Sequence, residues 1–137
     1  MYVVNDDYLA GIIDGEASFV IVVKKDERYR AGYRVITKFV LPQKNKQLLE
    51  MVREYLGFGK IYWYARDKLW YYEVYSRRDL HMLCSRICDK LVLKRNKCMR
   101  FKKILELLPP FTKYVSRETI AFIKTTWTAP ETGANPP

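Results

Sequence analysis

The sequence predicts an α+β fold in which helices alternate with β-hairpins. Two pairs of segments rich in aromatic and β-branched residues each flank a charged turn, which is the pattern of a β-hairpin. Elsewhere, apolar residues recur at the spacings of three and four that indicate amphipathic helices. The expected order is helix, hairpin, helix, hairpin, helix, helix, then one extra C-terminal helix. The strands are expected at residues 17–25, 33–41, 60–66 and 69–75, and the helices after the first at 44–56, 77–88, 94–108 and 116–127.

Composition indicates a basic globular domain. The chain has 137 residues, of which 49% are hydrophobic, so one domain with a substantial core is expected over residues 1–128, followed by a disordered tail at 129–137. The 25 Lys and Arg outnumber the 15 Asp and Glu, giving a net charge of +10. Such a balance favours a polyanionic partner, most simply nucleic acid, and salt-sensitive binding. The alternative is a basic surface that only keeps the domain soluble.

The cysteines predict a reducing compartment. Cys84, Cys88 and Cys98 are an odd number and not a disulfide framework, so buried reduced thiols are expected. A zinc site with His81, one helical turn before Cys84, is the alternative, but a closed site needs four ligands. No apolar run approaches the roughly 20 residues of a membrane span, and the N-terminus lacks a signal-peptide pattern. The expected location is intracellular, cytoplasmic or organellar, without secretion or a membrane partner.

Alternation along the first hairpin separates two faces. In its first strand, one face carries Ser18, Val20, Val22 and Lys24, and the other carries Phe19, Ile21, Val23 and Lys25. The second strand alternates better, with Arg34, Ile36 and Lys38 on one side and Val35, Thr37 and Phe39 on the other. Pro42 is expected to end this strand.

The second hairpin leaves its register open. Its first strand offers Lys60, Tyr62, Tyr64 and Arg66 on one face. A two-residue turn at Asp67-Lys68 would pair Arg66 with Leu69 and place Tyr71, Glu73 and Tyr75 on that same face. The other register places Tyr72 and Val74 there instead. The many aromatic residues of this hairpin are compatible with either a binding surface or a core.

The stretch from Tyr8 to Ser18 is the most informative part of the chain. Asn5 is a candidate N-cap, and Asp6 and Asp7 supply negative charge for a first helical turn. In a helix, one face would carry Tyr8, Gly11, Ile12, Gly15 and Glu16. Glycine inside a helix costs roughly 1 kcal/mol relative to alanine, and close packing of another helix against this face would compensate. No second such helix is evident in the chain, so a second copy of the protein is the expected partner.

Residues 9–17, which read LAGIIDGEA, closely resemble the signature motif of the LAGLIDADG homing endonucleases. Two positions depart from the common pattern: Glu16 stands where aspartate is usual, and Ala17 replaces the final glycine. The resemblance extends over roughly residues 5–108. It implies an αββαββα half-domain whose curved four-stranded antiparallel sheet packs under the helices and leaves one face available for DNA.

The resemblance also implies site residues. In this family the motif helices of two half-domains pack together, so a homodimer is implied, with an interface that includes Tyr8, Gly11, Ile12, Asp14 and Gly15. Glu16 corresponds to the metal-binding acid, and the Gly15 carbonyl to a further metal ligand. Gln43 matches the residue that positions solvent, and Lys94 the basic residue near the scissile phosphate. Asp14 is expected to cap a neighbouring helix rather than to bind metal.

Together these residues predict a site-specific, intron-encoded homing endonuclease. Two copies of Glu16 at a two-fold axis would repel unless a cation lay between them, and Mg²⁺ suits carboxylate and phosphate oxygens. Mn²⁺ is an alternative ion, as is Ca²⁺ bound without turnover. The expected reaction is metal-dependent phosphodiester hydrolysis that makes a double-strand break in a long pseudo-palindromic DNA target. Contacts to double-stranded DNA are expected from Ser18, Val20, Val22, Lys24, Arg34, Ile36, Lys38, Lys60, Tyr62, Tyr64 and Arg66. The alternative is a catalytically silent relative, either a splicing maturase or a DNA-binding regulator.

Overall fold

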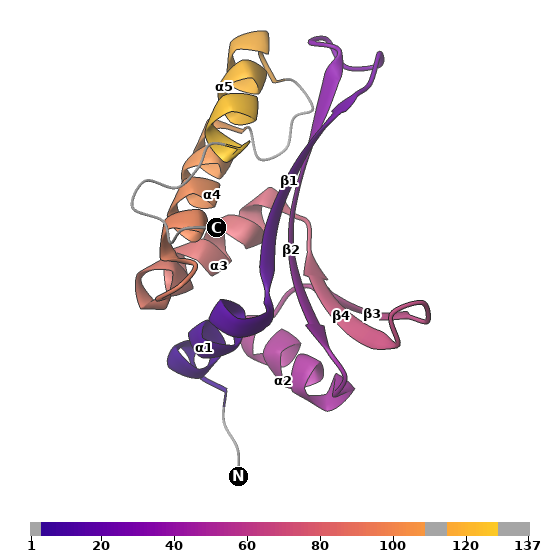
Figure 1. Cartoon of the computed structure of the whole chain (residues 1–137), viewed down its shortest axis with the longest axis vertical. Helices are drawn as coiled ribbons and strands as arrows, with labels where there is room; N and C mark the ends of the chain where they lie inside the picture. The colour runs from indigo at the N-terminus through magenta and orange to yellow at the C-terminus, as the bar shows by residue number, and fades with distance from the viewer. Residues whose placement is uncertain (1–3, 109–114, 129–137) are drawn as a thin grey trace.

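A computed structural model describes residues 4–108 and 115–128 (Figure 1). The expected tail at 129–137 lies outside the described residues, as does the segment 109–114. The order of elements agrees with the sequence prediction. The elements are α1 (Asp6–Glu16), β1 (Ser18–Lys25), β2 (Tyr33–Gln43), α2 (Lys46–Leu56), β3 (Lys60–Tyr64), β4 (Leu69–Val74), α3 (Arg77–Ile87), a 3₁₀ turn (Cys88–Lys90), α4 (Arg95–Leu107) and α5 (Arg117–Thr128).

The four strands form one antiparallel sheet in the order β1-β2-β4-β3. Figure 1 shows α1, α3, α4 and α5 together on one side of this sheet, with α2 at its lower end. The β1–β2 hairpin extends upward in that view and the β3–β4 hairpin extends to the right, so the uncovered face is curved. The predicted α+β class and curved four-stranded sheet are confirmed. We call the uncovered face of the sheet the outer face.

The covered face of the sheet builds the core. Phe19 and Ile21 of β1 and Phe39 and Leu41 of β2 are buried, which decides between the two faces that alternation separates. The ring of Phe19 lies 5.3 Å, centroid to centroid, from both Phe39 and Phe101 of α4. This aromatic group joins the sheet to the helical layer and fixes which way every other side chain of β1 and β2 points. Ser18, Val20, Val22 and Lys24 therefore lie on the outer face.

Pro42 does not end β2, contrary to the sequence prediction. The strand continues to Gln43, and Pro42 pairs with Tyr71 of β4. The pairing of β2 with β1 covers Tyr33 to Val40 only. At residue 42 one side of the strand is therefore an edge of the sheet, where the missing N–H of proline breaks no ladder hydrogen bond.

The register of the second hairpin is settled by a four-residue loop. Tyr64 pairs with Leu69, so Arg66 lies in the loop and not in the strand as expected. Lys68 in this loop has a φ of 54°, in the left-handed region. Relative to a two-residue turn the pairing slips by two residues, and such a slip leaves every side chain on its original face. The outer face therefore carries the odd-numbered residues of β4, while Tyr72 is fully buried.

The helices begin and end close to their expected bounds. Asn5, Asn45 and Ser76 each accept a backbone N–H with their side chains and cap α1, α2 and α3. Gly57 ends α2 in the left-handed conformation with φ 85°. Gly59 follows with φ 94°, and a Cβ there would lie 2.5 Å from the Tyr72 ring. The connection from α2 to β3 thus requires glycine for both backbone and packing reasons.

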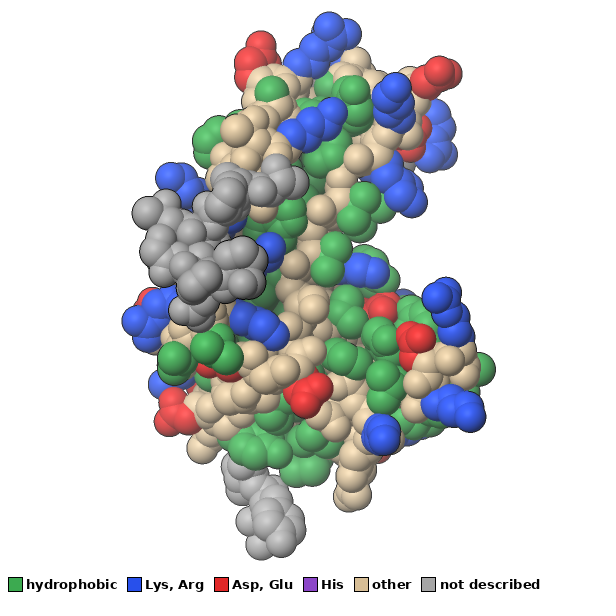
Figure 2. All heavy atoms as spheres, in the orientation of Figure 1, with side chains coloured by type: hydrophobic (Ala, Val, Ile, Leu, Met, Phe, Trp, Pro, Cys, Tyr) green, Lys and Arg blue, Asp and Glu red, His purple; other side chains and the backbone are tan. Residues whose placement is uncertain are grey.

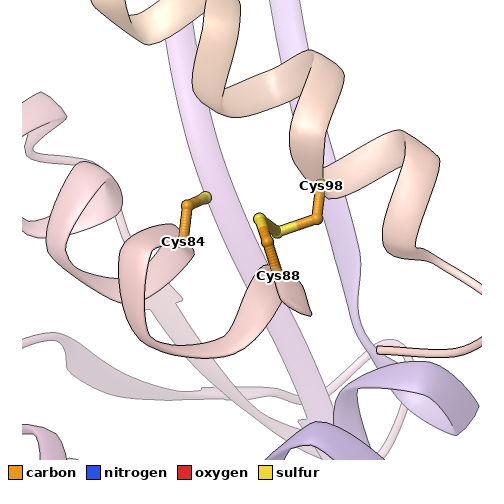
Figure 3. Close-up of side chains that lie close together, drawn as sticks. All are labelled: Cys84, Cys88 and Cys98. Carbon is orange, nitrogen blue, oxygen red and sulfur yellow. A yellow bond between two sulfur atoms is a disulfide. The ribbon is translucent and has the colours of Figure 1, made fainter. Parts of the chain in front are cut away.

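The expectation of reduced cysteines is wrong for two of the three. Cys88 and Cys98 form a disulfide with a Cα–Cα distance of 5.5 Å, and Cys84 is a buried free thiol beside it (Figure 3). The pairing arises because α4 packs back along α3 and brings Cys98 to the end of α3. Of the residues in the zinc alternative, the three cysteine sulfurs lie within 4.8 Å of one another, whereas His81 is about half exposed and lies 3.8 Å from Glu106.

Candidate catalytic site and nucleic-acid interface

Helix α1 is held at its N-terminal end by polar contacts from three other elements. Asp6 accepts a hydrogen bond from the Tyr55 hydroxyl of α2 at 2.7 Å and one from the Arg86 guanidinium of α3 at 3.0 Å. The bond to the carboxylate raises the pKa of Tyr55. Asp7 pairs with Lys90 at 2.8 Å. These contacts, with the buried side chains of Leu9 and Ile13, fix the helix axis relative to the sheet.

The opposite face of α1 is open. Tyr8 is 50% exposed, and Gly11 and Gly15 are exposed one helical turn apart. A Cβ added to either glycine would meet nothing within 4 Å. Within the described part of the chain, therefore, nothing fills the groove that these glycines leave, and the face is shaped for the close approach of another backbone.

Asp14 and Glu16 have separate roles at the C-terminal end of α1. The Asp14 carboxylate accepts three backbone N–H groups, from Val92 at 2.7 Å, Leu93 at 3.1 Å and Lys94 at 3.0 Å. It therefore caps the segment that leads into α4, as expected of it. Glu16 is exposed and makes no hydrogen bond or ion pair with another described residue.

Lys94 is brought to the same end of α1. Its ammonium group donates to the carbonyl oxygens of Ile13, at 3.0 Å, and Ala17. These carbonyls lie at the C-terminal end of the helix, where the partial charge is negative. Burial lowers the pKa of Lys94, while the nearby carboxylates of Asp14 and Glu16 act in the opposite direction. A cation and an exposed carboxylate thus lie near one another although they are 78 residues apart in sequence.

Gln43 stands apart from this pair. It is the last residue of β2, pairs with Trp70 across the ladder and is half buried. Its alternation with Leu41 places it on the covered face of the sheet and not on the outer face. Among the described residues it makes no hydrogen bond with Glu16 or Lys94. The structure brings together Asp14, Gly15, Glu16 and Lys94 and leaves the solvent-positioning role of Gln43 as a prediction.

The outer face carries the other predicted contact residues except Arg66, which lies in the loop of the second hairpin. Cross-strand pairing aligns Val20 with Lys38, Val22 with Ile36, and Lys24 with Arg34. Figure 2 shows Lys and Arg side chains around the tips of both hairpins. Arg34 is 38% exposed and lies 3.9 Å from Asp26. Asp26 is bound more closely by Arg28 at 2.8 Å, and this bond lowers the pKa of Asp26 to about 2.

Sequence reasoning did not select three outer-face residues of β4 and its C-terminal end, namely Tyr71, Glu73 and Tyr75. Glu73 pairs with Val40 on one side and with Lys60 on the other, so it lies in the centre of the outer face. Tyr71 pairs with Tyr62. Strand alternation identified these residues as one of two possible sets. The two-residue turn predicted this same set, because it differs from the observed four-residue loop by an even slip.

The chain thus combines a basic uncovered sheet with a helix that ends in an exposed carboxylate. The family model described as LAGLIDADG endonuclease matches residues 9–108, and the chain belongs to this family. The match includes α1 from Leu9 onward, both hairpins and Lys94. No helix in the described ranges is long and apolar enough to cross a membrane.

The relatives include intron-associated proteins and named nucleases. An uncharacterised 50.9 kDa protein in ND4 intron 1 of Podospora anserina is 32% identical in an alignment of 108 positions that covers 74% of this chain and 24% of that protein. DNA endonuclease I-CreI of Chlamydomonas reinhardtii is 27% identical over 74% of this chain and 63% of its own length. The chain thus spans about a quarter of the first relative and less than two thirds of the second.

The solved structures agree with the fold. The archaeal intron-encoded homing endonuclease I-Vdi141I complexed with DNA is 27% identical, with a TM-score of 0.68 over 74% of this chain and 66% of that chain. Meganuclease I-SmaMI bound to uncleavable DNA has a TM-score of 0.81 over 98% of this chain and 46% of that chain. At 23% identity, the second likeness shows the fold alone.

Proposed function

We propose that this chain is the DNA-cleaving module of a site-specific homing endonuclease, which makes a double-strand break by phosphodiester hydrolysis. The observation that carries the proposal is the exposed Glu16 carboxylate, which lies next to Lys94 and beside an open glycine face. Relatives named as DNA endonucleases, among them I-CreI, support the same reaction class.

A second copy of the chain is the partner we propose for α1. Gly11 and Gly15 have open space beside them, and Tyr8 and Ile12 offer apolar surface on the same face. With the two helices in contact, the two Glu16 carboxylates lie close to the symmetry axis. One active centre then contains residues from both copies, which suits a pseudo-palindromic target.

The residues present fit a divalent cation. Glu16 offers an exposed carboxylate without a protein partner among the described residues, and the carbonyl of Gly15 lies one residue before it. Mg²⁺ is the ion we propose, because it prefers oxygen ligands and phosphate. When bound, the ion supplies charge neutralisation at the scissile phosphate and lowers the pKa of bound water.

The other site residues act on DNA and solvent. The ammonium of Lys94, held by the Ile13 and Ala17 carbonyls, supplies positive charge for a phosphate near Glu16. Gln43 is proposed to orient solvent. The outer face follows the duplex, with Lys24, Arg34 and Lys38 as phosphate or guanine contacts. We propose a site of action inside the cell, in the cytoplasm or an organelle, in keeping with relatives whose names place them in introns.

The test is a selection of cleaved duplexes from a random library, in Mg²⁺ and in EDTA. The proposal predicts recovery of one family of related sites in Mg²⁺ and none in EDTA. Salt-sensitive binding of duplex DNA by the wild-type chain, with no cleaved site recovered, would instead identify a silent member of the family such as a maturase or a regulator.

A further inference from the structure

A buried carboxylate lies in the middle of the outer face. Glu73 is 3% exposed, although its neighbours across the sheet are Val40 and Lys60 of that surface. Two tyrosine hydroxyls bind it: Tyr64 donates to Oε2 at 3.0 Å and Tyr75 donates to Oε1 at 2.8 Å. The carboxylate is thus covered by the two phenol groups, one on each oxygen.

The direction of these two hydrogen bonds is fixed by chemistry. An ionised carboxylate only accepts hydrogen bonds, and a phenol has one proton to donate. Each hydroxyl therefore donates its proton to Glu73, and its oxygen can only accept a hydrogen bond from any further partner. Burial, followed by the hydrogen bond to Glu73, raises the pKa of both Tyr64 and Tyr75, so both phenols stay protonated at neutral pH.

The tyrosines are held in place and remain accessible. Tyr64 is 39% exposed and Tyr75 is 47% exposed. The Tyr64 ring lies 4.6 Å from the Tyr71 ring and 6.4 Å from the Tyr62 ring, centroid to centroid. Tyr71 in turn donates to Asp67 at 2.7 Å, so the proton of a third tyrosine hydroxyl in this hairpin is also bound by a carboxylate.

We propose that Glu73 turns the Tyr64 and Tyr75 hydroxyls into obligate hydrogen-bond acceptors that read the amino group of adenine or cytosine in the major groove. This inference rests on the proposed function, because it needs DNA on the outer face. In that groove, adenine N6 and cytosine N4 are the donors, whereas guanine O6 and N7 and thymine O4 are acceptors. Phosphate oxygens are also acceptors. The two tyrosines therefore specify bases and do not hold the backbone, and Glu73 is a positioning residue.

The Glu73→Gln substitution reverses one of these bonds without changing the shape of the side chain. The glutamine amide donates to one hydroxyl, and that hydroxyl then has its own proton available for DNA. The preference for an amino group at the contacted base should weaken or give way to a preference for an acceptor, which guanine, thymine and adenine N7 all offer. Removal of a negative charge also raises affinity for every duplex alike, so the readout is base preference and not overall affinity.

The experiment selects bound duplexes from a random library with the full chain, followed by competition binding at the selected positions. Wild type should prefer adenine or cytosine over guanine or thymine by about five- to tenfold, the lower end of the range for one base contact. Glu73→Gln should lose or invert that preference, and Tyr75→Phe or Tyr64→Phe should lose it. Glu50→Gln, on the exposed surface of α2, removes the same charge; it is the matched control and should leave the base preference unchanged.

Each result has a definite meaning. A changed base preference in Glu73→Gln, with thermal unfolding like that of wild type, supports the assignment. Identical base preferences in wild type, Glu73→Gln and both phenylalanine variants, with salt-sensitive binding retained, overturn the assignment and leave the proposed function intact. Absence of salt-sensitive DNA binding by wild type overturns both. If Glu73→Gln fails to fold, the phenylalanine variants decide by the same criterion.

Discussion

Replacement of Asp14 by alanine should destabilise the protein more than any other single change of an acid on α1. The carboxylate accepts backbone N–H groups from Val92, Leu93 and Lys94 at 2.7–3.1 Å. A hydrogen bond to a charged group contributes about 1.5–3 kcal/mol. The three hydrogen bonds share one carboxylate and are partly exposed, so in the alanine variant water can bind some of the freed backbone N–H groups and reduce the loss of stability. We expect the free energy of unfolding to fall by about 2–4 kcal/mol, a large part of the 5–15 kcal/mol typical of a domain.

The measurement is urea unfolding followed by far-UV circular dichroism. Asp14→Asn should lower the free energy of unfolding about half as much as Asp14→Ala, because its amide retains one acceptor oxygen. Asp7→Ala is the matched control: Asp7 is 79% exposed and makes one ion pair, with Lys90, so its loss should be below about 1 kcal/mol. Equal effects of Asp14→Ala and Asp7→Ala would refute the capping role and the argument that Asp14 positions Lys94.

Three further outcomes follow from the packing. Gly59→Ala should lower the free energy of unfolding by about 2–4 kcal/mol, because its φ is positive and its Cβ would meet the Tyr72 ring at 2.5 Å. Gly15→Leu should leave the folded chain at least as stable, because no atom lies within 4 Å of the new Cβ, yet it should abolish self-association measured by sedimentation. Reduction of the Cys88–Cys98 disulfide, which closes a short loop, should lower the free energy of unfolding by about 2–3 kcal/mol.

Each of these has a control in the same chain. Gly57 has a φ of 85° and open space where a Cβ would lie, so Gly57→Ala should lower the free energy of unfolding by only about 1 kcal/mol. An equal loss in Gly59→Ala would contradict the role of packing against Tyr72. Gln47→Leu, on the exposed side of α2, is the control for Gly15→Leu and should leave self-association unchanged. Unchanged self-association in Gly15→Leu would show that α1 is not the interface. Thiol titration of the unfolded chain should find Cys84 alone, and three reactive thiols would contradict the disulfide.

Alternation was informative wherever a strand had one covered face. Phe19 and Phe39 share one face and Val20 and Lys38 share the other, but neither face of β1 is purely polar, so the covered face was chosen from the resemblance and not from residue types alone. The second hairpin lacks such a contrast, because aromatic side chains occur on both of its faces. Its register depends on the four-residue loop. Lys68 in this loop adopts a positive φ, which the presence of a lysine does not predict.

The candidate site shows the same division. The resemblance to the family motif pointed to Glu16 and implied the capping role of Asp14, and both residues lie on one short helix. Contacts between distant segments were beyond such reasoning. The disulfide depends on how α4 returns along α3. The Glu73 cluster depends on a register that pairs Glu73 with Lys60 and lets the Tyr64 hydroxyl reach the Glu73 carboxylate along the outer face. Both needed the packed structure.

The central claim is that Glu16 supplies the carboxylate for phosphodiester hydrolysis. The most direct measurement compares wild type with Glu16→Gln on a selected duplex in Mg²⁺, recording both binding and cleavage. Glu16 is exposed and has no described partner, so the substitution should leave folding and DNA affinity within about twofold and reduce the cleavage rate by two or more orders of magnitude. Cleavage by Glu16→Gln at the wild-type rate would contradict the account.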